Sequence, residues 1–157
     1  PRMAESLNKR IIHVDSDFAL RKGYVYDEVS YQLLKEVETV YKEKGKLTDE
    51  VLSALQCVFQ ASLLPALDLV DKRSVSRVTC PAGRSLYQVV GSSGTPYTCF
   101  TSSVYCSCPA YRYSVLLKEE HMMCKHVLAI KISEAIGCVR VQEVSNQDIA
   151  NMIQHIE

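Results

Sequence analysis

The chain has 157 residues, 47% of them hydrophobic and 23% charged, and its 18 basic residues equal its 18 acidic ones. A chain of this size and composition can bury one good core, so we expect one compact globular unit. The balanced charge excludes the overall positive field that drives non-specific nucleic-acid binding. No apolar run reaches the roughly 18 residues of a membrane span, and we expect no membrane contact.

Residues 1–27 lack a sustained hydrophobic period, and the sequence predicts an N-terminal tail that is extended or disordered. A helical region is expected over residues 28–73. Its first helix runs from Glu28 to Lys44, because apolar residues follow helical spacing there and Gly45 ends the run. This first helix is therefore amphipathic.

Two shorter helices complete the helical region. Thr48 is a good N-cap for the second helix, which ends at Leu64-Pro65. Pro65 fits the first position of a third, short helix over residues 66–71. Apolar and acidic residues alternate in this third segment, which is too short to be a core helix by itself. We therefore place a partner contact near it, with a helix cap and connector as the alternative.

The pattern changes from helical to β after Arg73. Three segments rich in Val, Tyr and Thr alternate in polarity, at residues 74–80, 84–91 and 97–103. Turn residues separate them, Pro81-Ala82-Gly83 and Ser92-Ser93-Gly94. The sequence predicts a three-stranded antiparallel meander that leads into Cys106.

Three cysteines and a histidine follow the meander at metal-ligand spacing. Cys106 and Cys108 flank one residue, and fifteen residues later Cys124 and His126 flank another. Cys106 and Cys108 would reach the same ion in an extended chain, because residues i and i+2 of a strand point to one side. Cys124 and His126 require a helix entry, with Cys124 just outside the helix and His126 in its first turn. Together the four side chains predict a tetrahedral zinc site with no position left for water or substrate. The zinc is therefore expected to be structural and the protein not to be an enzyme.

Other assignments of the cysteines and histidines are weaker. Seven cysteines is an odd number and a Cys-X-Cys bridge would be strained, so we expect no disulfides and a reducing compartment. His121 is a runner-up ligand because it lies close to Cys124. The remaining cysteines sit among apolar residues and are expected to be small core side chains: Cys57, Cys80, Cys99 and Cys138.

A largely buried helix is expected after His126, and Gly137 ends it. Pro109 fits the first position of another helix, between the two ligand pairs. A C-terminal helix is expected within residues 138–157, with Ser145 as its N-cap. The fold class is therefore α+β, with N-terminal helices, a three-stranded antiparallel meander, a zinc knuckle with helices, and a C-terminal helix.

This order of elements resembles the SWIM zinc-binding domain, whose pattern is Cys-X-Cys, a variable spacer and Cys-X-His. Cys106, Cys108, Cys124 and His126 match that pattern residue by residue, and a SWIM-type domain is expected over residues 74–137. The surrounding sequence resembles the SWIM-domain subunits of the Shu complex, through residues 66–71, 87–93, 97–99 and 105–110. The resemblance runs from about residue 48 to the C-terminal helix, and residues before Glu28 lie outside it.

The resemblance implies a nuclear role in DNA repair by homologous recombination. Members of this family bind a recombinase paralogue with a RecA-like ATPase fold and promote the assembly or stability of recombinase filaments on single-stranded DNA. The chain has no GxxxxGK[ST] loop, so any ATP binding would belong to the partner. Contact with single-stranded DNA is expected mainly through that partner.

Two other functions remain open. Direct nucleic-acid binding by the zinc module would use a local basic and aromatic patch, formed by Arg84, Arg112, Lys118, Lys125, Lys131, Tyr105, Tyr111 and Tyr113. At this density such residues more often form a solvated face with half-buried tyrosines. A metalloenzyme is disfavoured by the filled ligand set.

Overall fold

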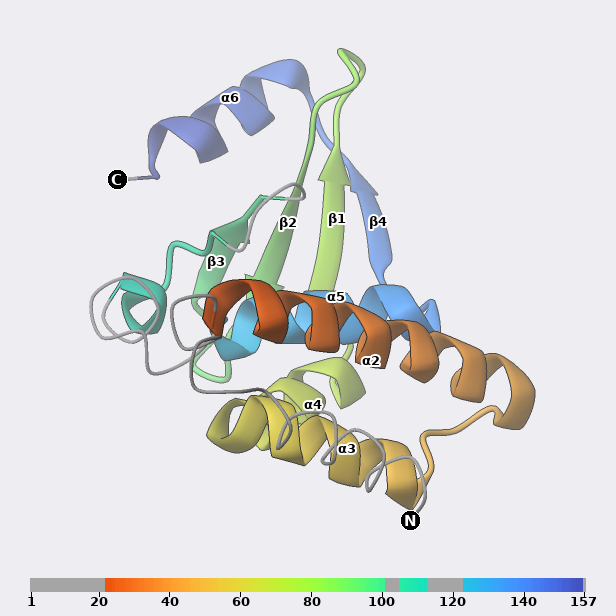
Figure 1. Cartoon of the computed structure of the whole chain (residues 1–157). Helices are drawn as coiled ribbons and strands as arrows, with labels where there is room; N and C mark the ends of the chain where they lie inside the picture. Colours follow the sequence, from red (N-terminus) through yellow and green to blue (C-terminus); the bar gives the residue numbers. More distant parts are fainter. Residues whose placement is uncertain (1–21, 101–104, 113–122, 157) are drawn as a thin grey trace.

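The structure is a computed structural model that describes residues 22–100, 105–112 and 123–156 (Figure 1). The helices are α2 (Lys22–Lys44), α3 (Asp49–Phe59), α4 (Leu63–Asp71), α5 (Lys125–Ile136) and α6 (Asn146–Gln154), with a 3₁₀ turn η2 (Gln60–Ser62) between α3 and α4. The strands are β1 (Val75–Thr79), β2 (Ser85–Val90), β3 (Pro96–Cys99) and β4 (Arg140–Glu143). The expected α+β class is confirmed.

The sheet has the strand order β3-β2-β1-β4. Strands β1, β2 and β3 form the expected antiparallel meander, with Val75 opposite Val89 and Tyr87 opposite Cys99. The sequence analysis missed β4, which pairs in parallel with β1 and makes the sheet mixed. All four residues of β4 are exposed, so it carries no hydrophobic alternation by which a strand could be recognised.

Helix α5 is the centre of the fold. It contacts α2 and α4 as well as β1, β2 and β3, and Figure 1 shows it between the sheet and the N-terminal helices. Val127, Leu128 and Ile132, among others, are buried. A helix that is apolar around most of its circumference must be covered on most sides, which explains the central position. The expected buried helix after His126 is confirmed, and Gly137 ends it at φ 73°.

Helix α2 begins earlier than expected. Residues 22–27, which the sequence analysis placed in the tail, belong to the helix, while residues 1–21 lie outside the described part. Extending an existing helix costs little, because nucleation is the expensive step, so a stretch without an apolar stripe can still be helical. The predicted stripe is confirmed in its centre, where Leu33, Val37 and Val40 are buried.

The two shorter helices differ in detail from expectation. Thr48 caps α3 as predicted, since its side chain accepts a hydrogen bond from the Val51 N–H. Gln60 then adopts φ 50°, and the chain passes through η2 into α4. Pro65 is the third residue of α4 and not the first. A proline is tolerated there because the N–H groups of a first helical turn have no acceptor within the helix.

The stretch Asp49–Asp71 is long and apolar enough to cross a membrane by length and composition alone, which the sequence analysis did not expect. In the fold this stretch is divided into α3, η2 and α4. Buried side chains of both helices, such as Leu55 and Leu69, belong to the main core. Its apolar character is therefore explained by core packing.

Helix α4 is a core helix, although the sequence analysis judged it too short for that. Leu69 and Val70 are buried and Leu67 is half-buried, because α4 packs against α5. Its outward side carries Leu64, which is 76% exposed, and Asp68, which forms a salt bridge with Lys72. Only this outward side is available to a partner.

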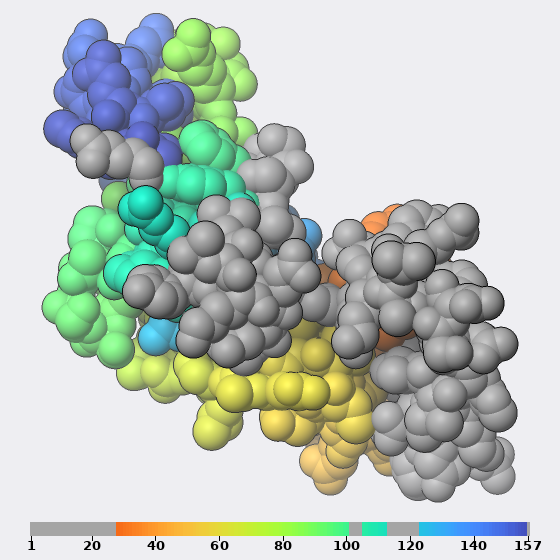
Figure 2. Space-filling view, turned by 60° about the vertical axis from the view of Figure 1, so that its left-hand side comes forward, coloured from red at the N-terminus to blue at the C-terminus, as the bar shows by residue number. Residues whose placement is uncertain are grey.

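Helix α6 packs against the other face of the sheet. Ser145 caps it through a complete capping box with Asp148, which confirms the predicted N-cap. Ile149 joins Val78, Cys80 and Leu86 in a second, smaller core. Figure 2 shows α6 and the β1–β2 hairpin together as a projection from the rest of the molecule.

Tyr87 of β2 links the sheet to α5, because its hydroxyl donates a hydrogen bond to the Glu134 carboxylate. Burial, followed by this bond, raises the pKa of Tyr87 from 10.0 to about 12. The Tyr87→Phe substitution is expected to lower the free energy of unfolding by about 1 kcal/mol at neutral pH, since one hydrogen bond is lost.

The pH dependence has a defined sign. A tyrosine whose pKa is raised on folding contributes stability below its unfolded pKa, and this contribution disappears as the pH rises through the folded value. Urea unfolding of both proteins between about pH 8 and about pH 12 should therefore show a difference that shrinks above about pH 10. A difference that is constant over this range would contradict the assigned bond.

Candidate metal centre

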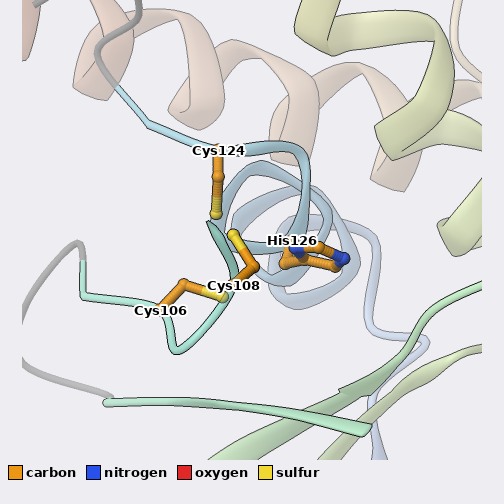
Figure 3. Close-up of side chains that lie close together, drawn as sticks. All are labelled: Cys106, Cys108, Cys124 and His126. Atoms are coloured by element: carbon orange, nitrogen blue, oxygen red, sulfur yellow. The ribbon is translucent and has the colours of Figure 1, made fainter. Parts of the chain in front are cut away.

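The structure brings together the four side chains that the sequence analysis selected. The ligand atoms of Cys106, Cys108, Cys124 and His126 all lie within 4.8 Å of one another, and all four residues are buried. Figure 3 shows the three sulfur atoms gathered beside the His126 ring. In a tetrahedral zinc site with Zn–S bonds of about 2.3 Å, neighbouring sulfurs are about 3.8 Å apart. Small side-chain movements would therefore bring the ligands to bonding distance.

The first ligand pair lies where the chain leaves the sheet. Cys106 forms an isolated antiparallel bridge with Cys99 at the end of β3. The extended conformation expected for the whole pair stops there, because Ser107 and Cys108 form a bend. Pro109 begins a helical turn as predicted. The Tyr111 N–H at this turn donates to Cys108 Sγ at 3.3 Å, so the sulfur caps the turn.

The second pair lies at the start of α5. Cys124 is the N-cap of the helix, and its sulfur accepts a hydrogen bond from the Val127 N–H at 3.5 Å. His126 follows as the second helical residue. This is the helix entry that the spacing predicts. Amide groups at helix N-termini favour negative charge, so both Cys108 and Cys124 are placed where a thiolate is stabilised.

The His126 ring gives independent support for a metal ion at this cluster. The residue is only 3% exposed, and neither ring nitrogen has a hydrogen-bond partner among the described residues. Buried polar atoms without a partner are rare, because each costs its full desolvation free energy. A metal bound through one nitrogen would account for it. The Tyr97 ring lies against the imidazole, with centroids 4.4 Å apart, and restricts its position.

The three thiols interact strongly with one another. Hydrogen bonds from Cys106 and then Cys124 lower the pKa of Cys108. Hydrogen bonding with Cys108 raises the pKa of Cys106, and hydrogen bonding with Cys106 and Cys108 raises the pKa of Cys124. The three thiols are therefore not independent, and a bound cation would favour the thiolate form of all of them.

The cysteines and histidines outside the ligand set differ in burial. Cys80 and Cys99 are buried and Cys138 is half-buried, as expected of small core side chains. Cys57 is exposed, contrary to expectation, because the buried stripe of α3 runs along the opposite side of the helix. His13 and the runner-up ligand His121 lie outside the described residues. His155 is exposed at the end of α6.

The proposed basic and aromatic patch is not assembled in the described residues. Tyr111 is only 8% exposed, and it packs edge-on against Tyr105, which also contacts Phe100. Tyr105 and Phe100 are half-buried, so these rings pack against one another and expose only part of their surface. Arg84 lies in the β1–β2 hairpin, at the end of the sheet away from α5 (Figure 1). Tyr113 and Lys118 lie outside the described residues.

Two neighbours of the site were not recognised as such from the sequence. Tyr97 contacts His126, and Cys99 is paired with Cys106. Alternation along β3 places Tyr97 and Cys99 on the same face, which was a usable signal. The position of β3 beside Cys106 depends on tertiary contacts, and no pattern in the sequence indicates it.

Comparison with known proteins identifies relatives along most of the chain. A zebrafish (Danio rerio) protein named zinc finger SWIM domain-containing protein 7 is 46% identical over 125 residues, covering 80% of this chain and 89% of that protein. The mouse (Mus musculus) protein of that name is 42% identical over 126 residues, covering 80% and 83%. The human (Homo sapiens) protein is 39% identical over 129 residues, covering 82% and 92%.

No family model matches the chain. No solved structure matches it either. The matches cover most of the chain and most of each relative, and the buried cluster of three cysteines and one histidine suits the zinc finger in their name. The chain belongs to the zinc finger SWIM domain-containing protein 7 family.

Proposed function

We propose that this protein is a non-catalytic subunit of a Shu-type DNA-repair complex in the nucleus. In this proposal it binds a RecA-like recombinase paralogue and promotes the assembly or stability of recombinase filaments on single-stranded DNA. The observation that carries the proposal is the buried cluster of three cysteines and one histidine in a chain of this family. Such a cluster can organise a binding surface, and it leaves no ligand position for chemistry.

The metal that suits this cluster is zinc, in a structural role. Three thiolates and one imidazole are ligands that Zn²⁺ prefers, and a closed set of four is typical of structural zinc. Cys106, Cys108 and Cys124 would bind through sulfur and His126 through a ring nitrogen. The bound ion would tie the end of β3 to the start of α5, which is the central helix.

The outward side of α4 is the best candidate for partner contact. Leu64 has the largest exposed fraction among the large apolar side chains of the described residues, and Asp68 follows four residues later on the same side. Large apolar side chains beside a charged rim are typical of protein interfaces. The core residues of α4 are buried on its other side, so a contact at Leu64 and Asp68 would not disturb the core.

Co-expression with the RecA-like paralogue tests the proposal. We expect a stable complex whose mass, measured by native mass spectrometry, gives its stoichiometry. Asp68→Lys should weaken it at least tenfold, because it reverses a charge beside Leu64. Glu38→Lys is the matched control, since Glu38 also forms an exposed salt bridge with the lysine four residues later. Failure of the wild-type pair to associate would contradict the proposed function, whereas a loss with Glu38→Lys alone would move the contact to α2.

DNA binding should depend on the partner. Lys plus Arg equals Asp plus Glu in this chain, and affinity for single-stranded DNA comes largely from counterion release by clustered basic residues. We expect the isolated protein to show almost no binding to a fluorescent oligonucleotide at physiological salt, and the complex to bind. Tight binding by the isolated protein, with a salt slope that flattens in an Arg112→Ala, Lys125→Ala double variant, would instead make the zinc module the DNA-binding element.

A further inference from the structure

A fourth cysteine, outside the ligand set, lies next to the metal centre. Cys99, the last residue of β3, is directly opposite Cys106 in an isolated antiparallel bridge. Both residues are fully or almost fully buried, at 0% and 1% exposure. The SWIM pattern does not include Cys99.

The hydrogen bonds around the bridge define its type. The Ser107 N–H donates to the Thr98 carbonyl at 3.0 Å, and the Thr98 N–H donates to Ser107 Oγ at 3.0 Å. Thr98 and Ser107 are directly opposite each other and form a hydrogen-bonded pair. Hydrogen-bonded and non-hydrogen-bonded pairs alternate along an antiparallel ladder, so the adjacent Cys99–Cys106 pair is a non-hydrogen-bonded pair. In such a pair the Cα atoms are about 4.5 Å apart and the side chains project to the same face. That separation lies within the range of about 4.4–6.8 Å found in disulfides.

We propose that Cys99 and Cys106 form a disulfide when the metal leaves, so that the centre is a zinc-controlled thiol–disulfide switch. The oxidant is a small-molecule disulfide such as oxidised glutathione. The Cys106 sulfur attacks one glutathione sulfur, the glutathione S–S bond breaks, and one glutathione thiol leaves. The Cys99 sulfur then attacks the Cys106 sulfur of the mixed disulfide and releases the second glutathione thiol. Two protein thiols are oxidised and one glutathione disulfide is reduced to two thiols.

The main-chain bridge distinguishes this pair from the other possible pairs. A Cys106–Cys108 bridge would close across a single residue and would be strained. Cys108 and Cys124 cap two separate helical turns, which a bound metal would tie together. Cys99 and Cys106 are instead held opposite each other by main-chain bonding that needs no metal.

The bound metal would hold the switch in its reduced form. A zinc-bound Cys106 sulfur would share a lone pair with the metal and would be a weaker nucleophile, and both cysteines are buried in the folded protein. Loss of zinc would free this sulfur. The disulfide in turn removes one of the four ligands, so zinc cannot rebind fully until the bridge is reduced. This inference needs only the centre of three cysteines and one histidine and does not depend on the proposed role in recombination.

Peptide mapping of the full-length protein tests the switch. Zinc-loaded protein is exposed to oxidised glutathione with and without EDTA, alkylated and digested. Trypsin leaves Cys99, Cys106 and Cys108 in one peptide, because no Lys or Arg lies between residues 85 and 111, and leaves Cys124 in another. Chymotrypsin then cuts after Phe100 and Tyr105 and separates Cys99 from Cys106. We expect a Cys99–Cys106 disulfide as the main product with EDTA, and none in the zinc-loaded protein.

Other products would overturn the proposal. A predominant Cys106–Cys124, Cys108–Cys124 or Cys106–Cys108 bridge, a stable glutathione adduct on Cys106, or equal oxidation with zinc bound would each do so. Zinc rebinding provides a second readout. The oxidised wild type should recover zinc only after dithiothreitol, whereas Cys99→Ser should not acquire this requirement. Cys80→Ser, which removes a buried cysteine of the second core, should behave as wild type. The wild-type map decides the matter even if Cys99→Ser does not fold.

Discussion

Replacing Cys124 by serine is expected to abolish zinc binding and to lower the unfolding temperature of the protein strongly. Cys124 is both a candidate ligand and the N-cap of α5. Serine is itself a good N-cap, so the substitution removes the metal and leaves the helix cap in place. Apparent zinc-binding free energies of small domains are about 10–16 kcal/mol. The net stability of a domain is only about 5–15 kcal/mol. Loss of the metal is therefore expected to remove a large share of the stability of this chain, and metal analysis with circular dichroism during thermal denaturation would measure both effects.

Matched variants separate the metal from the side chain. His126→Cys keeps a complete set of four ligands, all of them thiolates, so it should retain one equivalent of zinc and a cooperative transition. Cys57→Ser removes an exposed cysteine away from the cluster and should have no effect on either measurement. A full equivalent of zinc in Cys124→Ser would refute the ligand assignment. Retention that is lost when His121 is also replaced would assign a ligand position to His121.

Replacing Leu128 by alanine is expected to cost about 2–5 kcal/mol, the usual cost of such a cavity in a core. Leu128 is 0% exposed on α5, the helix that contacts both the sheet and the N-terminal helices. A void there reduces packing on both sides, because closely packed neighbours relax only in part. Urea unfolding of the zinc-loaded proteins would give the difference in the free energy of unfolding.

Val141→Ala is the control for this substitution. Val141 is 64% exposed on β4, and truncation there should change the free energy of unfolding by less than about 0.5 kcal/mol. Equal losses for Leu128→Ala and Val141→Ala would contradict the central position of α5. Zinc release can be followed in the same urea titration. If zinc is released at the urea concentration at which the core unfolds, the start of α5 and the core unfold together.

The position of α5 connects the fold to the proposed function. One helix supplies two of the candidate ligands at its first turn and the most central core residues along its length. A change in metal occupancy would therefore act on the helix against which α2 and α4 pack. Helix α4, on whose outward side we place the partner contact, packs directly against α5, which begins at the metal centre.

The sequence alone determined the features that depend on local chemistry. Ligand spacing selected Cys106, Cys108, Cys124 and His126, because metal geometry restricts which side chains can meet. The caps at Thr48 and Ser145 and the end of α5 at Gly137 were also predicted correctly. In each case a few neighbouring residues satisfy free backbone groups or adopt a special φ, so a short stretch of sequence is sufficient.

Tertiary structure decided the features that depend on residues far apart in the chain. Strand β4 exists because β1 offers an unpaired edge, since its own residues carry no strand pattern. Helix α4 is a core helix because α5 covers it. Its short length had suggested that it could not be a core helix by itself. The same holds for Cys99, which the sequence identified only as a core cysteine. It lies opposite Cys106 because Cys106 pairs with the end of β3, and main-chain pairing of that kind leaves no mark on residue type.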